Sequence, residues 1–171
     1  MSKRDLKKYL GTLAKEQVEE QLLELYDKFK DVKTYYDFVF NPKEEKLVQD
    51  ARLKITSEYF PIKGKRPKLR RSVPQKIIKH FILLGVDPYA VADVMLFAIE
   101  TAIKYSAKRE MKYASFYKSI YTAYAQATEY VIVYGIVPDY RDRLAAVHAE
   151  VHRQNWENGY EFDHTLESVK V

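Results

Sequence analysis

Apolar residues recur along most of this chain at spacings of three and four, which is the period of an α-helix. Between residues 15 and 32 the apolar positions form one stripe, and glutamate, glutamine, aspartate and lysine occupy the other face. Similar patterns or helix-start signals predict further helices at residues 2–10, 34–40, 42–59, 72–84, 88–105, 112–134 and 138–157. The periodicity therefore predicts an all-α protein.

Local signals indicate where several of these helices begin and end. Ser2 and Asp5 form a capping-box pair, and Ser72 with Gln75 repeats that spacing before the helix at 72–84. Gly85 suits a left-handed residue that ends this helix, and Asp87-Pro88 is a typical helix start. These signals predict separate helices joined by short connections.

The stretch from residue 88 to residue 105 is apolar nearly all round, as expected of a helix that others surround. We take it as the centre of the core. Residues 130–137 are rich in β-branched side chains, but no second convincing strand exists to pair with them, so we predict that the helix continues there.

The length of 171 residues is enough for one self-sufficient core. We predict a single helical domain over residues 1–171, a compact irregular bundle of six to eight helices with a loose tail from about residue 159 to residue 171. Pro42, Pro88 and Pro138 mark helix starts at intervals that approach a helical-repeat period, so a short α-solenoid of helical hairpins is the alternative.

Composition narrows the classes of function. The chain has no Cys, which excludes disulfides, thiolate metal sites and cysteine nucleophiles. The N-terminus lacks the apolar region of a secretion signal, and no window approaches the roughly 20 apolar residues of a membrane span. We expect a soluble cytoplasmic protein with no membrane partner.

Charge is concentrated in one place. The net charge is +5, and the run from Lys63 to Arg71 carries six cations and no acid, so the rest of the chain is close to neutral. Gly64 and Pro67 disfavour a helix there. The sequence thus predicts a basic connector at residues 61–72 between an N-terminal and a C-terminal helical block.

This basic patch is the predicted functional site. Basic side chains beside the free amides of a helix start can hold phosphate, which points to nucleic acid or another phosphate-bearing polyanion. The predicted anion-binding residues are Lys63, Lys65, Arg66, Lys68, Arg70, Arg71 and Ser72. Two alternatives stay open: an acidic protein partner, or a solvated connector that pairs with Glu16, Glu19, Glu44 and Glu45.

Enzyme chemistry has weaker support, and we predict no catalytic residue and no cofactor. His148 and His152 lie four apart on one helix face, a spacing that a metal can use, with His164 or Asp163 as an imaginable third ligand. They are weak candidates, and no metal is predicted, because the Glu of a zincin motif is missing. Asp93 and Glu100 share a face of an apolar helix and are the carboxylates to consider for acid–base work.

The aromatic cluster from Tyr35 to Phe40 supports a different class of function. If these side chains are exposed, the protein is an interaction module for a protein partner or a homodimer. This is the alternative to polyanion binding.

Several short segments resemble a small bacterial family of proteins classified only as a domain of unknown function. They are Tyr9-Leu10-Gly11-Thr12-Leu13, Val32-Lys33-Thr34-Tyr35-Tyr36-Asp37-Phe38, Tyr59-Phe60-Pro61, Lys68-Leu69-Arg70-Arg71-Ser72 and Leu84-Gly85-Val86-Asp87-Pro88. The similarity extends from about Ser2 to the last predicted helix. The resemblance implies a single short cytoplasmic helical domain with no assigned activity, and it assigns no catalytic or ligand residue.

Overall fold

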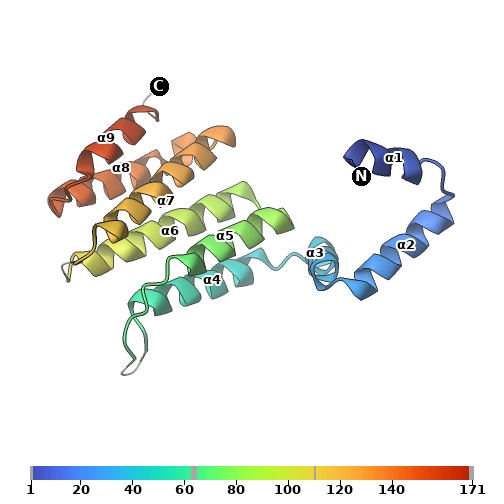
Figure 1. Ribbon diagram of the computed structural model, residues 1–171. Coiled ribbons are helices and arrows are strands. Elements are labelled where there is room, and N and C mark those ends of the chain that lie inside the picture. The colour runs from blue at the N-terminus through green and yellow to red at the C-terminus, as the bar shows by residue number, and fades with distance from the viewer. Residues whose placement is uncertain (1, 63–64, 110, 170–171) are drawn as a thin grey trace. The chain divides into compact units, whose positions relative to one another are not determined.

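The computed structural model describes residues 2–62, 65–109 and 111–169, and it is built of helices (Figure 1). Within these ranges there are nine helices and no strand, so the all-α prediction is confirmed. The helices are α1 (Lys3–Leu10), α2 (Lys15–Lys28), α3 (Lys30–Phe40), α4 (Glu44–Tyr59), α5 (Ser72–Leu84), α6 (Pro88–Ser106), α7 (Ala114–Val133), α8 (Val137–Arg153) and α9 (Gly159–Glu167). The number exceeds the predicted six to eight because α9 lies where a tail was expected.

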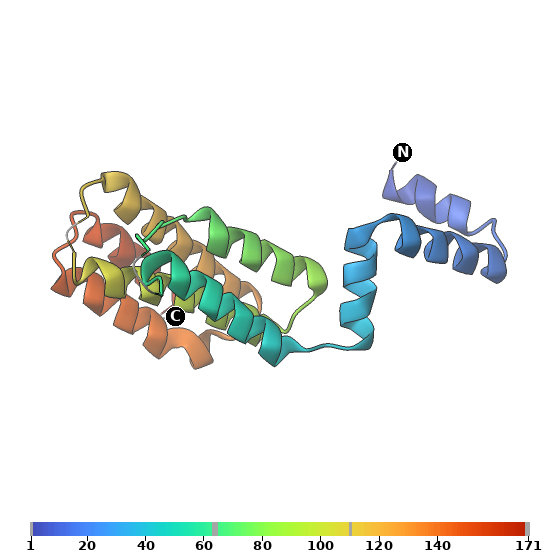
Figure 2. The ribbon, with the colours of Figure 1, turned by 90° about the horizontal axis from the view of Figure 1, so that it is seen from below.

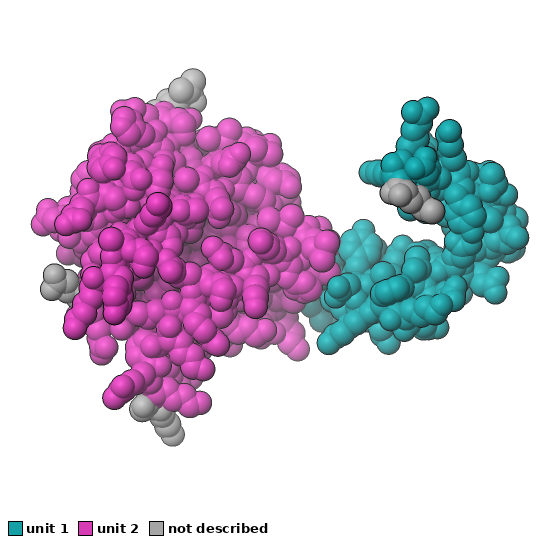
Figure 3. Space-filling view, viewed as in Figure 1, with its two compact units in different colours: residues 1–43 teal, residues 44–171 magenta. Residues whose placement is uncertain are grey.

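The helices form two compact units, which we call unit 1 (residues 1–43) and unit 2 (residues 44–171) (Figure 3). Unit 1 contains α1, α2 and α3, and α2 packs against α3. None of its described residues is buried. The prediction that residues 1–171 form a single domain stays a prediction.

Unit 2 is organised around α6 (Figures 1 and 2). This helix packs against α4, α5, α7 and α8, whereas α9 packs against α7 and α8. Because α6 has neighbours on several sides, most of its surface is removed from water. Its buried residues are Val91, Ala92, Val94, Met95, Leu96, Ala98, Ile99, Thr101, Ala102, Ile103 and Tyr105. The expectation that this helix is the centre of the core is confirmed.

The helix-boundary signals hold at some positions and fail at others. The Ser2 capping box is present, and Asp87 caps α6 by accepting a 2.8 Å hydrogen bond from the Tyr89 amide. Gly85 ends α5 in the left-handed region at φ 73°. The cap predicted at Ser72 is wrong, because Arg71 takes the N-cap position without a side-chain cap and Ser72 is already helical.

The helix predicted over residues 15–32 is interrupted at Phe29. Its backbone is extended, with φ −118° and ψ 113°, so Phe29 ends α2 and precedes α3. The aromatic residues from Tyr35 to Phe40 then belong to α3 and continue its helix.

The predicted loose tail is instead the packed helix α9. Phe162 is fully buried, and Leu166 and Val169 are buried beside it at spacings of four and three. The Phe162 ring lies 4.9 Å from Tyr124, 5.4 Å from Tyr121 and 6.0 Å from Trp156, measured between ring centroids. This aromatic contact holds the end of the chain on unit 2.

Among the residues that the structure describes, no helix has both the length and the apolar character required to cross a membrane.

Candidate functional site

The basic connector joins the end of α4 to the start of α5. The amides of Lys68 and Leu69 both donate to the carbonyl oxygen of Glu58, at 3.0 and 3.1 Å. Leu69 has φ 52°, in the left-handed region that a residue with a Cβ rarely adopts. The two hydrogen bonds therefore fix the connector against α4 just before α5 begins. Lys63 lies outside the described residues.

Arg70 is paired with a buried carboxylate. Its Nη2 and Nε donate to the two carboxylate oxygens of Glu58 at 2.6 and 3.0 Å, and its amide donates to the same group at 3.2 Å. Glu58 is only 5% exposed. The hydrogen bonds from Arg70 lower the pKa of Glu58, against a burial effect that raises it. The charge of Arg70 is thus neutralised within the fold.

Sequence reasoning missed Glu58 as this partner. The acids proposed to neutralise the connector were Glu16, Glu19, Glu44 and Glu45. Glu19 instead pairs with Lys15, and Glu44 accepts a hydrogen bond from the Asp87 amide. The signal was available, because position 58 lies three residues after Ile55 and seven after Ala51, on the face that α4 buries.

Arg71 joins the connector to the start of α7. Its guanidinium donates to the carbonyl oxygen of Ser115, at the start of α7. The Phe60 ring, at the other end of the connector, lies 5.7 Å from the Tyr105 ring at the end of α6. The connector is therefore next to the segment that links α6 to α7.

The end of α6 and that linking segment are also basic. Residues 104–112 carry four cations and one acid, Glu110, which lies outside the described residues. The Lys108 ammonium lies 5.8 Å from the centre of the Phe60 ring, and the Arg109 guanidinium lies 5.7 Å from that of Tyr105. Two basic segments that are about 40 residues apart thus meet at one end of unit 2.

We call this surface the basic end. Besides Arg70 and Arg71, which bond to Glu58 and Ser115, its exposed described cations are Lys65, Arg66, Lys68, Lys104, Lys108, Arg109 and Lys112. None of them forms an ion pair with another described residue. Ser72 is exposed at the start of α5, next to Arg71. Whether these residues bind an anion stays a prediction.

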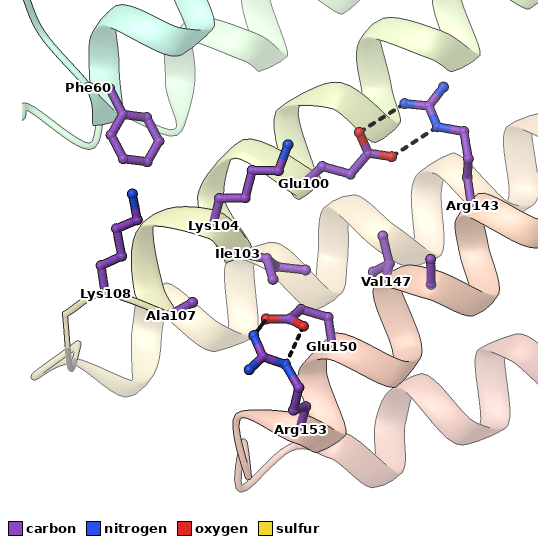
Figure 4. A pocket seen from close by; sticks show the side chains of 11 residues that line it. Phe60, Glu100, Ile103, Lys104, Ala107, Lys108, Arg143, Val147, Glu150 and Arg153 are labelled. Carbon is purple, nitrogen blue, oxygen red and sulfur yellow. Dashed lines mark hydrogen bonds and ion pairs between the residues drawn. The ribbon is translucent and has the colours of Figure 1, made fainter.

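A pocket of about 540 Å³ adjoins the basic end, between α6 and α8 (Figure 4). Lys104 lines it from α6, Lys108 lines it from the segment just after α6, and Phe60 lines it from the segment just after α4. Its two acids are each bonded to an arginine, Glu100 to Arg143 and Glu150 to Arg153, as the dashed lines in Figure 4 show. The two lysines are therefore the charged groups of the pocket that no described acid neutralises.

The carboxylates considered for acid–base chemistry belong to an ion-pair network. Arg143 donates to Glu100 at 2.9 and 3.1 Å and to Asp93 at 2.9 Å. Arg52 donates to the other oxygen of Asp93 at 2.6 Å. This network links α4, α6 and α8, and it satisfies both acids with structural partners.

The two histidines of α8 lie beside one acid of α9. Their Nε2 atoms are 2.5 Å (His148) and 2.8 Å (His152) from the same oxygen, Oδ1 of Asp163. These contacts lower the pKa of Asp163, the hydrogen bond with His148 being the larger cause. Of the two third groups imaginable from the sequence, the structure brings Asp163 into the cluster.

The aromatic cluster of unit 1 is partly exposed. Phe40 is 80% exposed, Val39 48% and Tyr35 42%. Tyr35 and Tyr36 meet edge to face at 5.3 Å, and Tyr36 stacks on Phe40 at 6.0 Å. The rings contact one another on α3 without being buried.

Comparison with known proteins gives one family. A family model described as "Family of unknown function (DUF6155)" matches residues 1–170. No curated protein and no solved structure matches the chain. The resemblance to a family of unknown function, stated from the sequence, is confirmed.

Proposed function

The chain belongs to the family of unknown function DUF6155, and we propose that it is a non-enzymatic protein that binds a polyanion through the basic end of unit 2. Nucleic acid is the class of polyanion that fits best. The observation that carries the proposal is the meeting of two basic segments, the connector and residues 104–112, at one surface.

The charge of this surface supports the proposal. Phosphate groups along a nucleic-acid backbone attract clustered lysine and arginine side chains, and binding releases the counterions of the nucleic acid. Besides Arg70 and Arg71, seven exposed described cations contribute to the basic end, and the charge of Arg70 is already paired with Glu58. The proposed surface thus extends beyond the predicted connector to the segment that links α6 to α7.

Exposed aromatic rings beside the cations favour single-stranded nucleic acid. Phe60 is 37% exposed and Tyr113, next to Lys112, is 74% exposed. Unstacked bases pack on such rings, a contact worth about 1–3 kcal/mol per base. A duplex keeps its bases stacked inside, so it would contact only the basic side chains, through its phosphates.

A fluorescence-anisotropy titration tests the proposal. We expect the full-length protein to bind a fluorescent oligo(dT) or oligo(U) of about 20 nucleotides at low salt, with affinity that falls as salt rises. If about six cations reach phosphates, the slope of log affinity against log salt will be about −4 for single strands. Replacing Lys65, Arg66 and Lys68 with Glu should weaken binding at least tenfold and make the slope shallower by about 2.

The matched control replaces three exposed lysines elsewhere, Lys30, Lys43 and Lys46, with Glu. This variant has the same change in net charge. It should bind nearly as the natural protein does. If the two triple variants lose the same affinity for the oligonucleotide, the loss reflects net charge and not a specific surface. The absence of binding at tens of micromolar protein would contradict the proposal.

The exposure of unit 1 favours a second candidate function. We infer that unit 1 associates with unit 1 of a second copy of the chain. No described residue there is buried, and many large apolar side chains are exposed: Leu6, Tyr9, Leu10, Leu22, Leu23, Leu25, Phe29, Tyr35, Val39 and Phe40. Its nine basic and eight acidic residues nearly balance, so two copies would not repel each other strongly.

Light scattering after size exclusion tests this self-association. We expect a dimer in the micromolar range that Leu23→Glu with Phe40→Glu converts to a monomer, since these side chains are 66% and 80% exposed. The control is Leu83→Glu with Tyr160→Glu in unit 2, where the exposed fractions are 67% and 63%. A monomer at every concentration up to a few hundred micromolar would contradict the inference.

A further inference from the structure

We propose that His148, His152 and Asp163 form a binding site for a divalent first-row transition metal ion, with Zn²⁺ as the ion that fits best. The site is separate from the basic end and requires no part of the polyanion proposal. It would join α8, which carries both histidines, to α9, which carries the aspartate.

The three donor atoms already converge. One ligand atom from each residue lies within 4.8 Å of the others, and both Nε2 atoms lie within 2.8 Å of Asp163 Oδ1. Zinc bonds of about 2.0–2.2 Å at tetrahedral angles place neighbouring donors about 3.3 Å apart. A metal would therefore fit between these donor atoms after side-chain shifts of less than about 1 Å.

The chemistry of the donors selects the class of metal. Two imidazoles and one carboxylate suit Zn²⁺ and its neighbours in the first row, whereas Mg²⁺ and Ca²⁺ prefer oxygen ligands alone. Three protein ligands leave a position for water on a four-coordinate ion. The side chains are 26%, 46% and 44% exposed for His148, His152 and Asp163, so water can reach that position.

The fold positions each donor. His148 and His152 are one turn apart on α8, and their ring centres are 4.5 Å apart. The buried Phe162 fixes the rotation of α9, which determines where the adjacent Asp163 lies. Gly159 leaves room for the His152 ring, because a Cβ there would lie 3.2 Å from its Cε1. The cluster thus depends on packing that is present without a metal.

Co²⁺ and Zn²⁺ titrations of the tag-free, full-length protein test the proposal. We expect one ion per chain by calorimetry, a Co²⁺ absorption band of a low-coordinate site, displacement of Co²⁺ by Zn²⁺, and reversal by chelator. Millimolar Mg²⁺ or Ca²⁺ should not displace the Co²⁺. Zn²⁺ should also raise the melting temperature, since it binds the folded chain.

The chain offers matched variants. His148→Ala, His152→Ala and Asp163→Asn should each weaken Zn²⁺ binding about tenfold or more, because each removes one of three ligands. The four histidines are His80, His148, His152 and His164. His164→Ala, beside the site on α9, and His80→Ala, on α5, are the controls and should bind as the natural protein does.

A measurement on the natural protein keeps the test independent of folding defects. In NMR spectra of the imidazole nitrogens, Zn²⁺ should shift the resonances of two histidines and leave the other two unchanged. Stoichiometric binding that survives His148→Ala, shifts at His80 or His164 instead, or no binding at 1 mM Zn²⁺ would each overturn the proposal.

Discussion

Replacing Arg70 with alanine is expected to lower the free energy of unfolding by about 2–3 kcal/mol, although Arg70 lies in a connector and is half exposed. The variant would leave Glu58 buried without the guanidinium that donates two hydrogen bonds to it. A buried charge that loses its partner keeps the full cost of its removal from water. Urea unfolding followed by circular dichroism measures the loss.

Arg66→Ala is the matched control, since Arg66 belongs to the same basic run and forms no ion pair with a described residue. It should change stability by less than about 0.5 kcal/mol. Equal stability of the two variants would mean that the pair between Glu58 and Arg70 contributes nothing to the fold.

The effect of Arg70→Ala should also depend on pH. Arg70 lowers the pKa of Glu58 in the folded protein, so this pair stabilises the fold above the unfolded pKa of about 4.3. The contribution is lost as the pH falls through the lower, folded pKa. We therefore expect the difference between the natural protein and the variant to be largest near pH 7 and to shrink below pH 4. A difference that stays constant from pH 7 to pH 3 would contradict this account.

Phe162→Ala is expected to destabilise unit 2 by about 3–5 kcal/mol, the range for removing a fully buried large side chain. Phe162 is 0% exposed and contacts three aromatic rings, two of them on α7. Its loss would leave a cavity and release α9. Urea unfolding gives the free energy, and hydrogen exchange of the α9 amides shows whether the helix is still held.

Tyr160→Ala is the control on the same helix. Its side chain is 63% exposed, so the variant should stay within about 0.5 kcal/mol of the natural protein. Similar unfolding energies for Phe162→Ala and the natural chain would show that residues 159–169 are a loose tail after all.

The sequence predicted the helical architecture well, because its signals are local. The apolar period identified α6 as the centre, and the Asp87 and Gly85 signals marked the turn before it. The Ser72 cap failed because the Glu58 contacts fix the connector and allow α5 to begin with Arg71 as its N-cap. This long-range contact overrides a weak local preference.

The last helix was missed for a different reason. Gly159 looks like a stop signal, yet it is the first residue of α9, where only a glycine leaves the His152 ring undisturbed. The apolar positions Phe162, Leu166 and Val169 do have helical spacing, but nine residues give too short a pattern for a firm prediction.

The candidate sites required contacts that no local pattern contains. The cationic run was visible in the sequence, but the pairing of Arg70 with the buried Glu58 was not. Likewise, the spacing of His148 and His152 left Asp163 and His164 as alternatives, and only the packing of α9 distinguishes them.

The position of Trp156 gives this chain a natural optical probe. It is the one tryptophan of the sequence, is 8% exposed, and packs against Phe116, Tyr117 and Phe162 in unit 2. Its emission will therefore follow the unfolding of unit 2 and carry little information about residues 1–43. A tryptophan signal compared with total helix content can thus separate the melting of the two units without any added label.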